Sequence, residues 1–319
     1  MNRLSLWMLR LILLAVLATT ATAADFDYAL KPRQIAEGTW VLLGRNEDFT
    51  FTNGGNIVNT AFVVTGAGVL VIDTGPSRLY GEQLRRAIAA ITDESIVKAL
   101  NTHHHPDHFL GNQAFPAQLI SALPPAIRGI ATEGRGFTDN LYRLSGDAMK
   151  GTEVVVPSQP IEPGEFSIGG HRFEAFSLDG HTASDLVIYD HTTGVLFAGD
   201  LVFNGRTPTT PHARIGRWLA SLDRLDALAP RIVVPGHGEI SELVGSNIGA
   251  ISQTRNYLHW LESTLLRAAQ RGLDMTEVMT LPLPPEVRGL AVIEPEFRRS
   301  VGHLYPAAEQ DALAHPHQH

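Results

Sequence analysis

Six consecutive residues, His103 to His108, read His-His-His-Pro-Asp-His and concentrate side chains that bind metals. Side chains two positions apart lie on the same side of an extended chain, so His103 and His105 can bind one metal ion together. The proline that follows turns the chain, so Asp107 and His108 can face a second ion a short distance away. This run therefore predicts a site for two metal ions.

Three further donors occur later in the chain, each beside a glycine. A catalytic metal ion needs several protein ligands and one open position. We expect His181 to complete the ligands of the first ion, His237 to complete those of the second, and Asp200 to bridge both. Imidazoles and carboxylates in this mixture suit two Zn²⁺ ions better than Ca²⁺ or Mg²⁺, and Mn²⁺ or iron would fit nearly as well.

Each of these motifs also has a purely structural explanation. A single His-x-His is common on protein surfaces, and an aspartate at the end of a strand can cap a helix. The ordered combination of all the motifs favours the metal site. Of the other histidines, His104 is a spacer expected to point away, and structural roles are expected for His171, His191 and His259.

Two further histidine-containing segments are not assigned to the site. His212, in the segment Thr-Thr-Pro-His, either lines the pocket or caps the following helix. The histidines among residues 315–319 can bind metal loosely, but a frayed terminus is the expectation there.

Composition restricts both the site and its partners. The chain has no cysteine, which excludes thiolate ligands, a cysteine nucleophile and disulfide bonds. Its formal net charge is −8, without a run of lysine or arginine. An acidic surface of this kind argues against nucleic acid or an anionic membrane as a partner and leaves a small-molecule substrate.

The first 23 residues have the pattern of a secretory signal peptide. Arg3 and Arg10 precede the apolar run 11–18, and the segment ends in Ala21-Thr-Ala23. The run is shorter than the ~20 residues that a bilayer span requires. We therefore expect cleavage after Ala23 and a periplasmic or secreted protein, with no membrane attachment after cleavage.

The elements that must position the donors form two groups of strands, each accompanied by helices. We expect a single domain over residues 24–306 and a flexible tail over 307–319. Strands are expected at 40–43, 57–64, 68–73, 96–100, 153–156, 171–178, 185–189, 195–197 and 231–234. Helices are expected at 77–91, about 124–150, around 218–225, and about 244–271. This order predicts an α+β fold in which two packed mixed sheets carry helices outside.

The donor pattern resembles the metallo-β-lactamase superfamily, whose signature is His-x-His-x-Asp-His followed by His, Asp and His. The resemblance extends from about Asn56 to His237 and implies an αββα sandwich with the metals at one edge of the sheets. It implies a first zinc held by His103, His105 and His181, and a second held by Asp107, His108 and His237, with Asp200 between them. Asp73 matches an Asp-Thr-Gly turn that orients ligands in this family.

A narrower resemblance concerns three segments, residues 53–59, 102–112 and 206–212. They look like those of the SoxH-related exported hydrolases, the quinoprotein relay system zinc metallohydrolases. This resemblance implies a functional link to periplasmic dehydrogenases that depend on pyrroloquinoline quinone (PQQ). Asp200 stands where true β-lactamases have cysteine or serine, so the pattern is closer to glyoxalase II-type and other general hydrolases.

The expected chemistry is hydrolysis by a hydroxide that bridges two zinc ions. Zinc lowers the pKa of its bound water to roughly 7, and Asp107 is expected to act as the catalytic residue that orients the hydroxide. The substrate pocket is expected to involve residues 49–56, a loop near 137–142, and residues 208–212, with the C-terminal helix at about 244–271 as a further candidate. Three alternatives stay open: a β-lactamase proper, an iron-dependent sulfur dioxygenase, and a non-catalytic metal-binding accessory protein.

Overall fold

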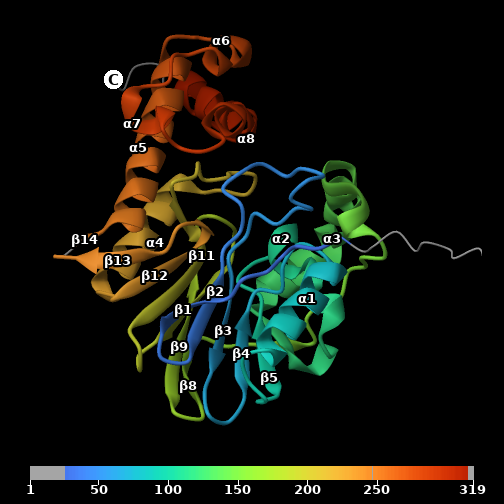
Figure 1. The fold of residues 1–319 in the computed structure, drawn as a ribbon. Coiled ribbons are helices and arrows are strands. Elements are labelled where there is room, and N and C mark those ends of the chain that lie inside the picture. Colours follow the sequence, from blue (N-terminus) through green and yellow to red (C-terminus); the bar gives the residue numbers. More distant parts are fainter. Residues whose placement is uncertain (1–25, 246, 315–319) are drawn as a thin grey trace, which may run out of the picture.

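Two β-sheets of seven strands each lie face to face in the computed structural model, which describes residues 26–245 and 247–314 (Figure 1). The first sheet has the order β1 (Arg33–Ala36), β2 (Thr39–Leu42), β3 (Thr60–Val64), β4 (Val69–Ile72), β5 (Ile96–Leu100), β6 (Ile120–Ala122) and β7 (Gln159–Pro160). Its strands are antiparallel from β1 to β4 and parallel from β4 to β7. The sheet is therefore mixed, as expected.

The second sheet contains strands β8 to β14, which lie side by side in the order of the chain. It comprises β14 (Asn247–Ile248), β13 (Ser241–Val244), β12 (Ile232–Gly238), β11 (Val195–Asn204), β10 (Asp185–Asp190), β9 (His171–Leu178) and β8 (Gly164–Ile168). The pair β11 and β12 is parallel and the other neighbours are antiparallel. The expected hairpin between 185 and 197 is present as β10 and β11.

Helices cover the outer faces of both sheets. The first sheet is covered by α1 (Arg78–Ala89), α2 (Pro106–Phe109) and α3 (Pro124–Ser145), and the second by α4 (Ile215–Ala227) and α5 (Gly249–Gln270) (Figure 1). The remaining helices α6 (Met275–Met279), α7 (Pro285–Arg288) and α8 (Ile293–Ala314) gather around the far end of α5. Short 3₁₀ turns are η1 (Leu110–Ala114), η2 (Ala117–Leu119) and η3 (Gly146–Met149). The predicted αββα sandwich is confirmed.

The strands are buried on both faces because each sheet lies between a sheet and a layer of helices. In β4, Leu70 and Ile72 belong to the cluster between the two sheets, whereas Val69 and Val71 belong to the cluster beneath α1. Successive side chains of a strand point to opposite faces, so a continuous apolar run fills two cores at once.

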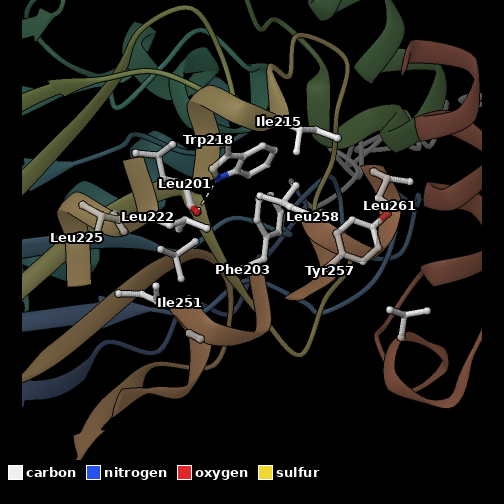
Figure 2. Close-up of a cluster of buried hydrophobic side chains, with 14 of the residues drawn as sticks. Leu201, Phe203, Ile215, Trp218, Leu222, Leu225, Ile251, Tyr257, Leu258 and Leu261 are labelled. Carbon is white, nitrogen blue, oxygen red and sulfur yellow. Dashed lines mark hydrogen bonds between the residues drawn. The ribbon is translucent and has the colours of Figure 1, made fainter. Parts of the chain in front are cut away.

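A third core packs α4 and α5 onto the outer face of the second sheet (Figure 2). Trp218 of α4 is fully buried there, and its indole N–H donates a hydrogen bond of 2.9 Å to the carbonyl of Leu201. Its ring also lies against the imidazole of His181, with centroids 5.0 Å apart. The core of the second half of the molecule therefore supports one of the expected metal ligands directly.

The strand predicted at 153–156 is wrong, and β6 and β7 form this edge of the first sheet instead. Val154 and Val156 pack beside α3, while Val155 packs beside α1. The carbonyl of Val155 accepts a hydrogen bond of 3.0 Å from the side-chain amide of Asn112. The apolar residues of this segment therefore contribute packing and not a strand of the sheet.

The C-terminal region differs from expectation in two places. The helix predicted from residue 244 begins at Gly249, because 241–244 pairs with β12 as strand β13. The tail expected from residue 307 overlaps α8, which is helical through Ala314 and packs on α5. Residues 315–319 and the predicted signal peptide lie outside the described residues. None of the described helices is long and apolar enough to cross a membrane.

Asn59 joins the two sheets at the end where the expected ligands lie. Its side-chain amide donates hydrogen bonds of 2.9 Å to the carbonyl of Pro235 and 2.8 Å to that of Gly238. Its side-chain oxygen accepts a hydrogen bond of 3.1 Å from the N–H of Gly44. The two carbonyls are buried and have little access to water, so the side chain of Asn59 supplies the hydrogen bonds that they need.

Replacing Asn59 with alanine should lower the free energy of unfolding by about 2–4 kcal/mol, because two buried carbonyls and one partly buried N–H would lose their partners. Denaturant unfolding followed by circular dichroism measures the change. Asn140→Ala, at an exposed position of α3, is the control and should not lower the unfolding midpoint, because alanine favours helix more than asparagine does. Equal midpoints for the two variants would show that Asn59 does not stabilise the contact between the sheets.

Candidate metal centre

The seven expected ligands converge at one edge of the sandwich from four stretches of chain. They are His103, His105, Asp107 and His108 after β5, His181 between β9 and β10, Asp200 in β11, and His237 near the end of β12. Local sequence explains part of this arrangement. The extended segment after β5 stops at Pro106, which occupies the first position of α2 and directs the following residues back toward the site.

The first group of donors contains His103, His105, His181 and Asp200, whose ligand atoms all lie within 4.8 Å of one another. His181 Nε2 is 2.8 Å from His105 Nδ1 and 3.3 Å from Asp200 Oδ2. His103 Nε2 lies 3.9 Å from the same carboxylate oxygen. All four residues are buried.

The second group contains Asp107, His108 and His237, also within 4.8 Å of one another. Asp107 Oδ2 lies 3.7 Å from His108 Nε2 and 3.4 Å from His237 Nε2. Asp200 reaches this group too, with Oδ1 3.1 Å from His108 Nε2 and Oδ2 3.3 Å from His237 Nε2. Its carboxylate therefore stands between the two groups.

Some of these donor atoms lack hydrogen-bond partners within the described part of the chain, which fits the binding of divalent cations. The Nε2 atoms of His103 and His108 are buried and have no hydrogen-bond partner among the described residues. An unpartnered polar atom in the interior is costly, and native proteins seldom retain one without a reason. Nitrogen and carboxylate oxygen atoms that converge this closely can offer lone pairs to one point, which is what a metal ion requires.

Burial keeps several of the imidazoles neutral. It lowers the pKa of His103 and His105 well below the usual value, and it lowers the pKa of His181 to about 3. Neighbouring imidazoles add to this effect at His103 and His105. Neutral imidazole is the form that binds metal, so these residues need no deprotonation before they act as ligands.

The negative charge of Asp200 and the neighbouring imidazoles affect one another's pKa values. Burial opposes ionisation of this carboxyl, but His237, His108 and His181 hold its pKa well below the usual range. At His108, burial lowers the pKa, and the carboxylates of Asp200, Asp73 and Asp107 together raise it well above its usual value. The centre is therefore built around an ionised carboxylate that is paired with nearby imidazoles.

The outer nitrogens of His108 and His237, which face away from the centre, are each held by a neighbouring group. Asp73 Oδ2 lies 2.7 Å from His108 Nδ1, and Asp73 also accepts hydrogen bonds from the backbone and hydroxyl of Thr102 at 2.8 and 2.9 Å. His237 Nδ1 donates to the carbonyl of Ile57 at 2.7 Å. A carbonyl can only accept, so Nδ1 of His237 carries the hydrogen and Nε2 is left for a metal.

The turn that carries His181 is held from two sides. Asp185 accepts hydrogen bonds from the backbone N–H of His181 at 3.1 Å and from that of Thr182 at 3.0 Å, and burial raises the pKa of Asp185 to about 7. Gly180 lies against α4, where an added Cβ would stand 2.2 Å from Trp218 Cα. Only glycine permits this approach, which places His181 against the core.

Other sequence expectations had mixed outcomes. His171 pairs with Asp190 at 2.8 Å, and His191 pairs with Glu174 at 2.9 Å, both outside the centre as predicted. His104 is not among the ligands, but its ring lies beside His105 and not away from the centre. The expected loop at 137–142 is wrong, because these residues belong to helix α3.

Two residues make long-range contacts around the site that the sequence analysis did not predict. Glu133 of α3 lies beside the ring nitrogens of His104 and His212, at 3.6 and 3.2 Å. Arg206 is fully buried, donates to the carbonyl of Glu47, and lies 3.7 Å from Glu296 of α8. Both act through contacts between segments distant in the chain, which neither periodicity nor motif spacing reveals.

Known proteins resemble the part of the chain that carries these residues. The profile of the Metallo-beta-lactamase superfamily matches residues 53–237. A linear primary-alkylsulfatase from a Pseudomonas species is 22% identical over 277 residues, which cover 74% of this chain and 52% of the relative. An atrochrysone carboxyl ACP thioesterase from Aspergillus fumigatus is 29% identical over 184 residues, which cover 58% of this chain and 51% of the relative. The matched region thus spans about half the length of these two relatives.

Among solved structures, a metallo-beta-lactamase from Pontibacter korlensis has a TM-score of 0.56 and 22% sequence identity. The superposition covers 72% of this chain and 99% of that structure. At this level of identity the similarity concerns the fold, and it agrees with the sandwich described above.

Asp73→Asn should weaken zinc binding by about 10–100-fold, because the outer nitrogen of His108 would lose its anionic partner. Competition with a chromophoric chelator measures the affinity. Asp190→Asn is a matched control, since Asp190 makes a comparable buried contact of 2.8 Å with His171 outside the centre. A zinc affinity as high in Asp73→Asn as in the control would contradict the orienting role.

Proposed function

Because this chain belongs to the metallo-beta-lactamase superfamily, we propose that it is a hydrolase that uses two zinc ions to act on a small-molecule substrate. The observation that carries the proposal is the position of Asp200, whose carboxylate lies between a group of three histidines and a second group of two histidines and Asp107. Both groups are buried at one edge of the sandwich. Their donor types suit zinc, and manganese or iron would be accepted by the same atoms.

When bound, a zinc pair supplies a nucleophile at neutral pH by lowering the pKa of water to about 7, and it polarises the bond to be broken. The residues of the chain hold and orient the reactants. His103, His105 and His181 would hold one ion, and Asp107, His108 and His237 the other, with Asp200 shared by both.

We assign Asp107 a second task, the orientation of the attacking water. Its Oδ2 lies 3.4 Å from His237 Nε2 and 3.7 Å from His108 Nε2, so the carboxylate is at the centre of its group. Only one of its two oxygens is needed as a ligand, and the other can accept a hydrogen bond from the water. A carboxylate in this position fixes the water without becoming a covalent nucleophile.

The substrate is proposed to be an acyl ester or thioester. Asp200 occupies the position where β-lactamases have cysteine or serine, which favours a general hydrolase over a β-lactamase proper. The thioesterase name of the Aspergillus relative supports the same class, and the alkylsulfatase name of the Pseudomonas relative makes sulfate esters the next class to test.

The variants His103→Ala, His105→Ala and Asp107→Ala should each lower metal-dependent turnover by more than about 100-fold, because each removes a ligand of a buried ion. Turnover is measured on a panel of esters, thioesters, lactones, lactams, phosphoesters and sulfate esters. Unfolding midpoints of the variants, measured without added metal, check that the loss is not a failure to fold. Undiminished turnover in all three would overturn the proposed function.

Metal analysis of the protein from its native cells separates the rival functions. Two zinc ions per chain are expected, together with loss of turnover after chelation and its recovery on adding zinc. One iron per chain would favour the iron-dependent sulfur dioxygenase. A metal-loaded protein that turns over none of the panel would favour the non-catalytic accessory protein.

We further propose that the protein works outside the cytoplasm in a periplasmic quinoprotein oxidation system. The signal-like segment that ends at Ala23 and the absence of cysteine support export. The resemblance of residues 53–59, 102–112 and 206–212 to the quinoprotein-associated hydrolases supports the link.

Sequencing the N-terminus of protein from the periplasmic fraction should give Ala24 as the first residue. A strain that lacks the protein should then lose PQQ-dependent dehydrogenase activity in that fraction, and a plasmid copy should restore it. An unprocessed N-terminus in the cytoplasm would contradict export, and unchanged dehydrogenase activity would contradict the link.

A further inference from the structure

His105 is the one expected ligand whose outer nitrogen is held by another histidine. Its Nδ1 faces the first group of donors, 2.8 Å from His181 Nε2. Its Nε2 lies 2.9 Å from Nδ1 of His212, which belongs to the segment between β11 and α4. The two rings are nearly parallel, with an angle of 29° between their planes. The contact joins residues 107 positions apart in the chain.

A carboxylate continues this chain of contacts. His212 Nε2 lies 3.2 Å from Glu133 Oε2, on helix α3. The side chains of His212 and Glu133 are 33% and 42% exposed, whereas His105 is buried. The series from His105 through His212 to Glu133 therefore connects the interior of the centre to the surface.

The chemistry of the three groups determines where the hydrogens lie. The carboxylate of Glu133 lies 3.2 Å from Nε2 of His212 and has no hydrogen of its own, so this contact favours the tautomer of His212 with its hydrogen on Nε2. Nδ1 of His212 is then an acceptor and receives the hydrogen of His105 Nε2. With its hydrogen on Nε2, His105 has a free lone pair on Nδ1, directed at the other donors.

We propose that His212 and Glu133 are positioning residues that hold the ring orientation and tautomer of His105 and thereby set the metal affinity of the first group of donors. This inference rests on the proposed metal-dependent function. A carboxylate that acts on a metal ligand through hydrogen bonds orients the ring and increases its basicity. Here the carboxylate of Glu133 acts through the imidazole of His212. The contact between them also joins α3 to the segment before α4.

A set of substitutions at His212 distinguishes this role from simple packing. His212→Ala removes the acceptor of His105 and should weaken zinc binding to the first group by about 10–100-fold. In His212→Asn the side-chain oxygen can take the place of Nδ1, so this variant should recover much of the affinity. Glu133→Gln keeps an acceptor without its charge and should give a smaller loss than His212→Ala. Zinc bound per chain and its stepwise affinities are measured by competition with a chromophoric chelator.

The matched control is His191→Ala, which removes a partly exposed histidine that also pairs with a glutamate, Glu174, at 2.9 Å. It should bind zinc as the unchanged protein does, and thermal unfolding of all metal-free variants checks their folding. The inference is overturned if His212→Ala binds both ions with undiminished affinity, or if His212→Asn is no better than His212→Ala. It is also overturned if the unchanged protein binds three ions and His212→Ala binds two, because His104, His105 and His212 would then hold a cation of their own.

These results are distinguishable from failure of the proposed function. A protein that binds no zinc in any form would contradict the proposed function itself. A protein that binds two zinc ions, and does so equally well in every His212 and Glu133 variant, would contradict only the positioning role.

Discussion

The carboxylate of Asp200 is a buried negative charge on which the organisation of the centre depends. It lies 3.1 Å from His108 and 3.3 Å from both His181 and His237. An ionised carboxylate is costly to bury unless it is paired or bound to a metal. The surrounding imidazoles meet part of this requirement, and their unpartnered nitrogens indicate that cations meet the rest. The sandwich must therefore hold several distant segments within a few ångströms of this one group.

Contacts from both sheets meet that requirement. Asn59, just before β3, binds the carbonyls of Pro235 and Gly238 on either side of His237. On the opposite flank, Gly180 allows the turn of His181 to approach Trp218 of α4 more closely than any side chain would permit. The ligands are thus fixed by the packing of the sandwich as well as by their own hydrogen bonds, which is what a preorganised site requires.

The two groups of donors are supported differently. The outer nitrogen of His108 contacts Asp73, which is itself buried and bonded to Thr102. The outer nitrogen of His105 contacts His212, whose own partner Glu133 is partly exposed. One side of the centre is therefore held by the interior of the first sheet, and the other by side chains from α3 and the segment before α4.

The motifs and apolar patterns of the chain were enough to predict the donor set and the layered fold. Spacing within the run from His103 to His108 is a local property, and the strand and helix patterns depend on periodicity over short stretches. Tertiary structure decided the rest. Whether residues 154–156 form a strand or pack beside helices depends on which hydrogen-bond partners are near. Here the side-chain amide of Asn112 donates a hydrogen bond to the carbonyl of Val155. His212 was undecided and Glu133 carried no signal, because their contacts with His105 exist only after α3 and the segment before α4 meet at the centre. Local patterns specify which side chains can act, and packing between distant segments specifies which of them touch.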